Sequence, residues 1–293
     1  MENRIQILKD KMLSQPRYVS MEQALIITRT YQEHENESAQ MKRAYALYNA
    51  LNELEIGIEP EELIVGNRTK GVRYGVVFPE SGISWVDKEL ETIDSRPQDR
   101  FLVRPEDIET FRKEILPYWK GKSLEDVLRQ RAGEKIDAIS KVVKINQKDH
   151  AQGHICPNVA EWLEKGPQGL KEEALHHLET CTSDKQDFYR SIVLIMEGVQ
   201  NFMMRYHDLL LKEVAKTSQH ASTMKKVAEI CANLSRRPAQ TFHEAVQSMW
   251  FLFVILHMES NASSFSPGRL DKTLYPYYKK DKEELLIDRK SVV

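Results

Sequence analysis

Cysteine is scarce in this sequence, which contains only Cys156, Cys181 and Cys231 among its 293 residues. The three cysteines lie far apart and form no CxxC pair, which argues against a disulfide framework and against zinc sites built from paired cysteines. A sparse, odd set of thiols is typical of a reducing compartment. We therefore expect a cytoplasmic protein.

An excess of one charge and long apolar runs are also missing. The 42 basic and 44 acidic side chains leave a formal net charge of −2, which provides no electrostatic basis for binding nucleic acid or an anionic membrane. A membrane-spanning helix requires a run of about 18 apolar residues, and no such run occurs. The N-terminus alternates charged and apolar residues and lacks the continuous apolar core of a signal peptide. We expect neither a nucleic-acid partner nor a membrane span.

Several common catalytic motifs are absent as well. The sequence has no strand–GxGxxG–helix or P-loop spacing, no GxSxG and no helical HExxH, which argues against nucleotide binding, serine hydrolysis and zinc proteolysis through those motifs. What is present is an ordinary globular composition, with 41% hydrophobic and 29% charged residues. This balance suffices for a substantial core.

Apolar residues at helical spacing predict a mainly α-helical chain with a few short strands. Ser20 is a plausible N-cap for the second helix, Pro117 is expected to interrupt helix near the middle of the chain, and Arg237-Pro238 ends another helix. Gly-rich and β-branched stretches predict short strands at residues 63–65 and 76–78. The predicted helices cover residues 2–13, 21–33, 41–54, 104–128, 187–214, 224–234 and 241–258.

The predicted helix at 241–258 is apolar at almost every position in its second half. A helix that is apolar on all sides is buried within a large protein. We expect that a chain of 293 residues is too short to cover this helix completely.

The first of three candidate segments contains Gly66-Asn67-Arg68 and Arg73. Two arginines beside glycines could bind a carboxylate or phosphate through forked hydrogen bonds. The alternative, favoured by the missing P-loop spacing, is an ordered turn whose arginines pair with nearby acids. Those acids are Glu61, Glu62 and Glu80.

The second candidate segment, residues 149–157, brings two histidines, a carboxylate and a thiol together in the sequence. A zinc site would use His150, His154 and Cys156, but no HExxH or CxxC spacing supports one. Gly153 would let the backbone approach a ligand next to His154, whose neutral ring can donate and accept hydrogen bonds. A loop histidine that only ties down the backbone is the other interpretation.

The third candidate segment, residues 259–271, follows the apolar helix directly. Hydroxyl and amide groups delivered to the interior must find partners or bind a polar molecule. A helix C-cap followed by a turn at Pro267-Gly268 explains the same residues equally well.

These segments are where the chain resembles a known family. The resemblance lies within residues 4–281 and rests on the stretches ELIVGNRT, VFPE, SRPQDRF, QGHI and ESNASSFSPGRLDKTLYPYYKKD. They are similar to the N-terminal half of glycyl radical enzymes of the pyruvate formate-lyase type, in the glycerol dehydratase and "putative formate acetyltransferase" branch. The resemblance implies the N-terminal part of a ten-stranded α/β barrel.

The resemblance also implies a chemistry. In this family a separate iron–sulfur activase uses S-adenosylmethionine to install a glycyl radical. That radical passes to a cysteine, whose thiyl abstracts hydrogen from the substrate. By motif position, His154 and Ser264 would bind the hydroxyls of a small substrate such as glycerol or a diol. Asn261, Arg269 and Asp271 would order the loop. Full-length members would act as lyases or dehydratases and form homodimers.

Neither the thiyl cysteine loop nor the Arg-Val-x-Gly-Tyr radical motif occurs in this sequence. We therefore expect residues 1–287 to be an incomplete portion of the family domain, with no catalytic residue, metal or cofactor of its own, and to be inactive alone. Residues 288–293 read DRKSVV, a peptide that one frame of a common sequencing adapter encodes, so we expect a non-native tail. The alternative function is a genuine short helical module that binds a full-length enzyme or its activase.

Overall fold

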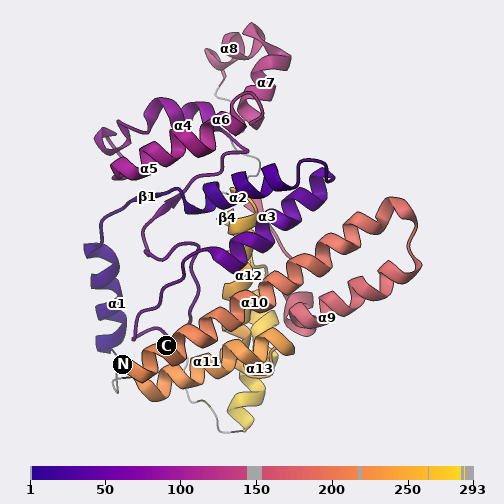
Figure 1. Cartoon of the computed structure of the whole chain (residues 1–293). Helices are drawn as coiled ribbons and strands as arrows, with labels where there is room; N and C mark the ends of the chain where they lie inside the picture. Colours follow the sequence, from indigo (N-terminus) through magenta and orange to yellow (C-terminus); the bar gives the residue numbers. More distant parts are fainter. Residues whose placement is uncertain (1, 144–153, 217–219, 263, 285–286, 288–293) are drawn as a thin grey trace.

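The computed structural model describes residues 2–143, 154–216, 220–262, 264–284 and 287 of the chain (Figure 1). In this part the protein is mainly α-helical with a few two-residue strands, as expected. The first elements are α1 (Glu2–Ser14), β1 (Val19–Ser20), α2 (Glu22–Glu33), α3 (Ala39–Glu53), β2 (Gly75–Val76), α4 (Ile83–Glu89), η1 (Ile93–Ser95), α5 (Pro105–Thr110), η2 (Phe111–Ile115), α6 (Leu116–Trp119), α7 (Leu124–Ala132) and α8 (Glu134–Ser140).

The second half contains the longer helices. Its elements are β3 (His154–Ile155), α9 (Val159–Thr180), η3 (Ser183–Lys185), α10 (Gln186–Lys216), α11 (Ala221–Arg236), α12 (Phe242–Glu259), β4 (Ser264–Phe265) and α13 (Leu270–Glu283). None of the helices that the structure describes is both long and apolar enough to cross a bilayer.

Helix α10 is the centre of the larger core and packs against α3, α9 and α11. Its fully buried side chains recur every three or four residues, which places them on one face of the helix. They include Val199, Phe202, Met203, Tyr206 and Leu210. The core that α10 organises therefore follows directly from the apolar periodicity of the sequence.

Helix α2 contributes to two cores from different faces. Ile26 packs in the larger core around α10, whereas Ala24 and Ile27 pack in a second cluster with residues of α4, η2 and α6. The segment from α4 to α8 lies above α2 in the view of Figure 1. Because α2 is shared, it joins the two cores.

Two parallel strand pairs connect segments that are far apart in the sequence. Strand β1 pairs with β2, and β3 pairs with β4. The predicted N-cap Ser20 is wrong, because Ser20 lies in β1 opposite Val76 and Met21 precedes α2 without a side-chain cap.

The predicted strand at residues 63–65 is also wrong. The backbone N–H of Val65 donates to the side-chain amide oxygen of Gln247 at 2.8 Å, and the Gln247 amide donates back to the Val65 carbonyl at 2.7 Å. A buried glutamine on α12 thus provides the hydrogen bonds that a neighbouring strand would otherwise supply.

Pro117 does not interrupt the helix, contrary to the prediction. The helix runs from α5 through η2 to α6, and η2 is a π-helical turn in which the Leu116 N–H bonds to the Phe111 carbonyl. The wider turn accommodates the proline, which has no N–H to donate.

Helix α12 is largely buried, as its composition predicts, but one stripe stays partly exposed. Ala245, Phe251 and Val254 are buried, whereas Trp250 keeps 36% of its surface exposed. The other partly exposed members of this stripe are Val246, Met249, Phe253 and Leu256.

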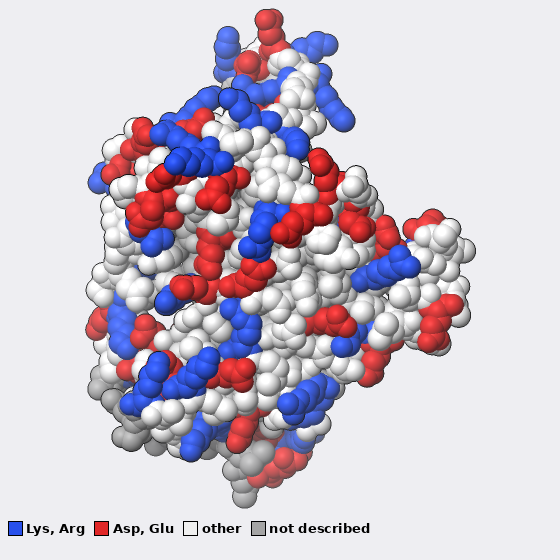
Figure 2. Space-filling view, in the orientation of Figure 1, with Lys and Arg blue, Asp and Glu red and all other residues white. Residues whose placement is uncertain are grey.

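Acidic and basic side chains are intermingled over the molecular face shown in Figure 2.

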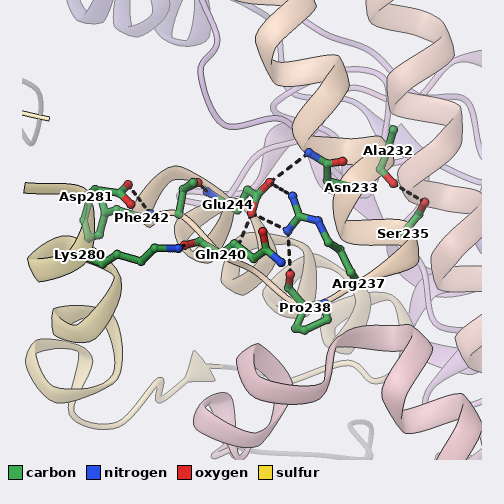
Figure 3. Close-up of polar contacts among 11 residues, drawn as sticks. Ala232, Asn233, Ser235, Arg237, Pro238, Gln240, Phe242, Glu244, Lys280 and Asp281 are labelled. Atoms are coloured by element: carbon green, nitrogen blue, oxygen red, sulfur yellow. Dashed lines mark hydrogen bonds and ion pairs between the residues drawn. The ribbon is translucent and has the colours of Figure 1, made fainter. Parts of the chain in front are cut away.

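A polar cluster fixes the start of α12 (Figure 3). The guanidinium of Arg237 donates to both carboxylate oxygens of Glu244 at 2.7 and 2.9 Å, and the N–H of Gln240 donates to Glu244 at 2.8 Å. The N–H of Phe242 donates to the carboxylate of Asp281 in α13 at 2.7 Å. These contacts tie α11, α12 and α13 together, so both helices that flank residues 260–269 are held.

Candidate functional site

The β3–β4 pair brings two predicted site residues together. His154 is the register partner of Ser264, and Ile155 is the partner of Phe265. The N–H of Ser266 continues the pairing by donating to the Ile155 carbonyl at 2.8 Å. Register partners in adjacent strands project from the same face of the sheet. The imidazole and the hydroxyl therefore lie on one side of this short ladder.

The two side chains differ in their surroundings. His154 is exposed, whereas Ser264 is partly buried and its hydroxyl oxygen is inaccessible to water. Within the described residues, this hydroxyl has no hydrogen-bond partner. A buried hydroxyl without a partner is energetically unfavourable, so a polar ligand that gained access to it would be stabilised by a hydrogen bond.

Packing against α12 holds β4 in place. The ring of Phe265 packs edge-to-face on Phe253 at a centroid distance of 5.3 Å and lies 6.3 Å from the His257 ring. Edge-to-face aromatic pairs are favourable contacts. The residue next to Ser264 is therefore anchored to the helix that precedes the segment.

The predicted loop-ordering residues occupy two different settings. Arg269 and Asp271 form a two-pronged ion pair with distances of 2.9 and 2.6 Å, and both side chains are exposed. This contact spans the start of α13. Asn261 is half-buried just beyond α12. The ordering role of these three residues remains a prediction.

The zinc alternative cannot be assembled from the described residues. Of its three ligands, His150 lies outside the described residues, and His154 and Cys156 are both exposed. Where the structure describes the chain, no three His, Cys, Asp or Glu side chains gather in a group that could hold a metal ion.

The arginines of the first candidate segment do not converge on a common ligand position. Arg68 donates to the His257 carbonyl at 3.0 Å, and Arg73 donates to the carbonyls of Leu13 and Gln15, each at 3.0 Å. Both expectations fail here, because the arginines form neither a joint clamp nor ion pairs with the nearby acids. They bind backbone carbonyls instead.

Two side chains close to the site escaped the sequence analysis. Gln23 in α2 donates to the Met258 carbonyl at 3.0 Å, and Arg43 in α3 donates to Glu259. Gln23 is 1% exposed. Gln23 follows Glu22 and lies before the apolar run that begins at Ala24, so its sequence context gave no signal of burial.

Burial perturbs two ionisable groups beside these contacts. Burial raises the pKa of the Glu80 carboxyl, and one oxygen of that carboxyl has no partner among the described residues. Burial also lowers the pKa of the Arg68 guanidinium. Desolvation disfavours the charged form in both cases.

Known proteins resemble the chain over nearly its whole length. The probable dehydratase YbiW of Escherichia coli is 32% identical over 279 residues, which cover 90% of this chain and 34% of that protein. The glycerol-bound form of the B12-independent glycerol dehydratase from Clostridium butyricum superposes with a TM-score of 0.90 at 31% identity. The superposition covers 96% of this chain and 37% of that structure.

A glycyl radical enzyme from Archaeoglobus fulgidus superposes with a TM-score of 0.91 at 29% identity, covering 98% of this chain and 38% of that structure. The chain thus spans about a third of the length of these relatives. The helical fold described above corresponds to that third of their larger fold. The family model described as pyruvate formate lyase-like matches residues 1–293. The chain therefore belongs to the pyruvate formate lyase-like family.

Proposed function

We propose that this chain forms the substrate-binding part of a glycyl radical lyase or dehydratase that acts on a small hydroxylated substrate such as glycerol or a diol. The observation that supports the proposal most directly is the pairing of His154 with Ser264 across β3 and β4. Two side chains from distant parts of the sequence thereby face the same side of one ladder.

The chemistry of the pair suits a polyol. A neutral imidazole donates one hydrogen bond and accepts another, and a serine hydroxyl does both. Neighbouring strands lie about 4.8 Å apart, so one molecule of a few carbon atoms could bond to both side chains once the Ser264 hydroxyl is uncovered. The two residues would orient the substrate, and the hydroxyl of Ser264 would gain the partner that it lacks among the described residues.

The comparisons support the substrate class. The similar proteins include a probable dehydratase from Escherichia coli and a glycerol dehydratase with glycerol bound. The pyruvate formate-lyase name of the family does not by itself select pyruvate as the substrate, because function depends on the site and not on the fold.

The remaining parts of the proposal concern the whole enzyme. The glycyl radical would be installed by an activase that uses S-adenosylmethionine and an iron–sulfur cluster, and the full-length protein would be a cytoplasmic homodimer. Asn261, Arg269 and Asp271 would order the loop around Ser264. None of these residues would take part in the radical transfer.

Amide NMR of the isotope-labelled chain tests the binding role. Glycerol and 1,2-propanediol should shift the signals of His154, Ser264 and their strand neighbours, whereas 1-propanol, with one hydroxyl, should bind more weakly. His154→Ala or Ser264→Ala should reduce affinity by roughly tenfold, the effect of losing one hydrogen bond.

The matched control is His176→Ala, which removes an exposed histidine on α9 far along the chain from the site. It should bind polyols like the unaltered chain. The binding role is refuted if glycerol perturbs neither strand, or if the shifts persist unchanged in both site variants.

A further inference from the structure

The C-terminal end of α12 is bonded to side chains from three other segments. A helix leaves its last four backbone carbonyls without partners inside the helix. In α12 the first of these, on Leu256, accepts from the N–H of Ser260 at 3.1 Å and from its hydroxyl at 3.2 Å. The other three carbonyls, on His257, Met258 and Glu259, accept from side chains distant in sequence.

Each of those three carbonyls has its own donor. Arg68 donates to the His257 carbonyl at 3.0 Å, and Gln23 donates to the Met258 carbonyl at 3.0 Å. Arg43 donates to the Glu259 carbonyl at 2.7 Å. Every otherwise unpaired acceptor at this helix end is therefore satisfied, and the donors come from α2, α3 and the loop between α3 and β2.

The two arginines are suited to this position by charge. The C-terminus of a helix has partial negative charge, which favours a nearby cation. Among the described residues Arg68 forms no ion pair, so the helix end is the negative group that its desolvated guanidinium meets. Arg43 binds the Glu259 carboxylate as well, at 2.6 and 3.2 Å.

These contacts lie just before the chain leaves the helix. Ser260 follows α12 with extended backbone angles, φ −136° and ψ 148°, and β4 begins at Ser264. The position of Ser264 relative to His154 thus depends on where α12 ends and in which direction the chain continues.

We propose that Gln23, Arg43 and Arg68 act together as positioning residues that fix the end of α12 and thereby hold Ser264 opposite His154. Their value for substrate binding rests on the proposed function, but the positioning itself does not. The same proposal gives the Gly66-Asn67-Arg68 motif a role, which is to bind α12. Arg68 donates to the His257 carbonyl, and the Gly66 carbonyl accepts from Trp250 at 2.8 Å.

Hydrogen exchange of the Ser266 amide measures the positioning, because that N–H bonds to the Ile155 carbonyl across the β3–β4 pair. Gln23→Met keeps the side-chain length and Arg68→Met keeps most of the unbranched stem, and both remove the donor. Each should speed exchange of this amide by about tenfold, as expected for the loss of one supporting hydrogen bond. Arg68→Lys restores a charged donor and should return the rate most of the way.

Arg73→Met is the matched control, since this arginine also donates to backbone carbonyls but of Leu13 and Gln15, away from α12. It should leave the Ser266 amide unchanged. Exchange of the buried α10 amides, measured in the same spectra, establishes that each variant is folded; if Arg68→Met does not fold, the comparison of Arg68→Lys and Gln23→Met with the unaltered chain decides.

The positioning role is overturned if the donor-deleting variants keep the Ser266 exchange rate, or if Arg73→Met raises it as much. A glycerol titration of the same samples separates the two proposals. Faster exchange in the variants with no glycerol binding by the unaltered chain would refute the binding role and support the positioning role. Glycerol binding that is equal in all samples, with an unchanged exchange rate of the Ser266 amide, would support the binding role and refute the positioning role.

Discussion

The carboxylate of Asp281, near the end of α13, accepts a hydrogen bond from the backbone N–H of Phe242, the first residue of α12, at 2.7 Å (Figure 3). Asp281 is 3% exposed, and its second oxygen has no partner among the described residues. An acid from one helix therefore caps the positive end of another.

Removing this cap should destabilise the chain. We expect Asp281→Ala to lower the free energy of unfolding by about 1–2 kcal/mol, the usual cost of losing a capping side chain. Asp281→Asn keeps an oxygen acceptor and should cost less. Urea titration measures both, with Glu283→Ala on the exposed side of α13 as a control expected to stay within about 0.5 kcal/mol. Equal stability of the Ala variant and the unaltered chain would contradict the capping role.

Gly166 should tolerate no side chain. Its backbone has φ 61° and ψ 179°, a region that only glycine adopts readily, and an added Cβ would lie 3.2 Å from the Pro238 Cα. We expect Gly166→Ala to lower the free energy of unfolding by about 2–3 kcal/mol. Gly169→Ala, in the same helix, has no such backbone strain and places its Cβ 3.2 Å from the Lys165 Cβ, so it should cost less than Gly166→Ala. A similar loss in both variants would show that the strain at Gly166 is unimportant.

Glu62 should make stability depend on pH. Burial, with smaller contributions from the Glu59 and Glu61 carboxylates, raises the pKa of Glu62 from 4.5 to about 7. Below pH 4.5 the carboxyl is protonated in both states and its stabilising contribution is complete. As pH rises to about 7, the unfolded chain loses this proton before the folded chain does. The stabilising contribution of Glu62 to the free energy of unfolding is therefore lost.

The variant Glu62→Gln isolates this effect, because a neutral amide does not titrate. The unfolding free energy of the unaltered chain minus that of the variant should fall between pH 4.5 and 7, by at most about 3 kcal/mol before screening by solvent. Thermal melts or urea titrations across this range provide the measurement. A difference that is constant with pH would contradict the raised pKa.

The cysteines should differ in reactivity. Cys156 is exposed, whereas Cys231 is fully buried in α11 and burial raises the pKa of its thiol to about 12. Since the thiolate is the reactive form, a disulfide reagent should modify Cys156 rapidly and Cys231 only when the chain unfolds. In Cys156→Ser the rapid phase should lose one thiol, which leaves the partly exposed Cys181, and in Cys231→Ser it should persist in full. Loss of that phase in the second variant would contradict the buried position of Cys231.

The local elements were largely predictable because they depend on neighbouring residues. Apolar spacing located α10, and Thr241 caps α12 by accepting from the N–H of Glu244. Two of the failures share one cause, which is a partner from elsewhere in the chain. Ser20 pairs with Val76 in a strand, and the backbone of Val65 bonds to Gln247.

The candidate site, too, was predictable from the sequence only in part. Motif position nominated His154 and Ser264 one at a time, but spacing along the chain does not reveal that the two are register partners. Gln23 and Arg43 attracted no notice in the sequence, since their role depends on carbonyls at the end of α12.

By itself, then, the sequence determined the mainly helical character, the apolar faces and the family resemblance, because these depend on residue type and short-range spacing. Only the tertiary structure decided which distant groups share hydrogen bonds. Buried backbone and side-chain polar groups must be paired, and the packing of α2, α3 and α12 selects the partners.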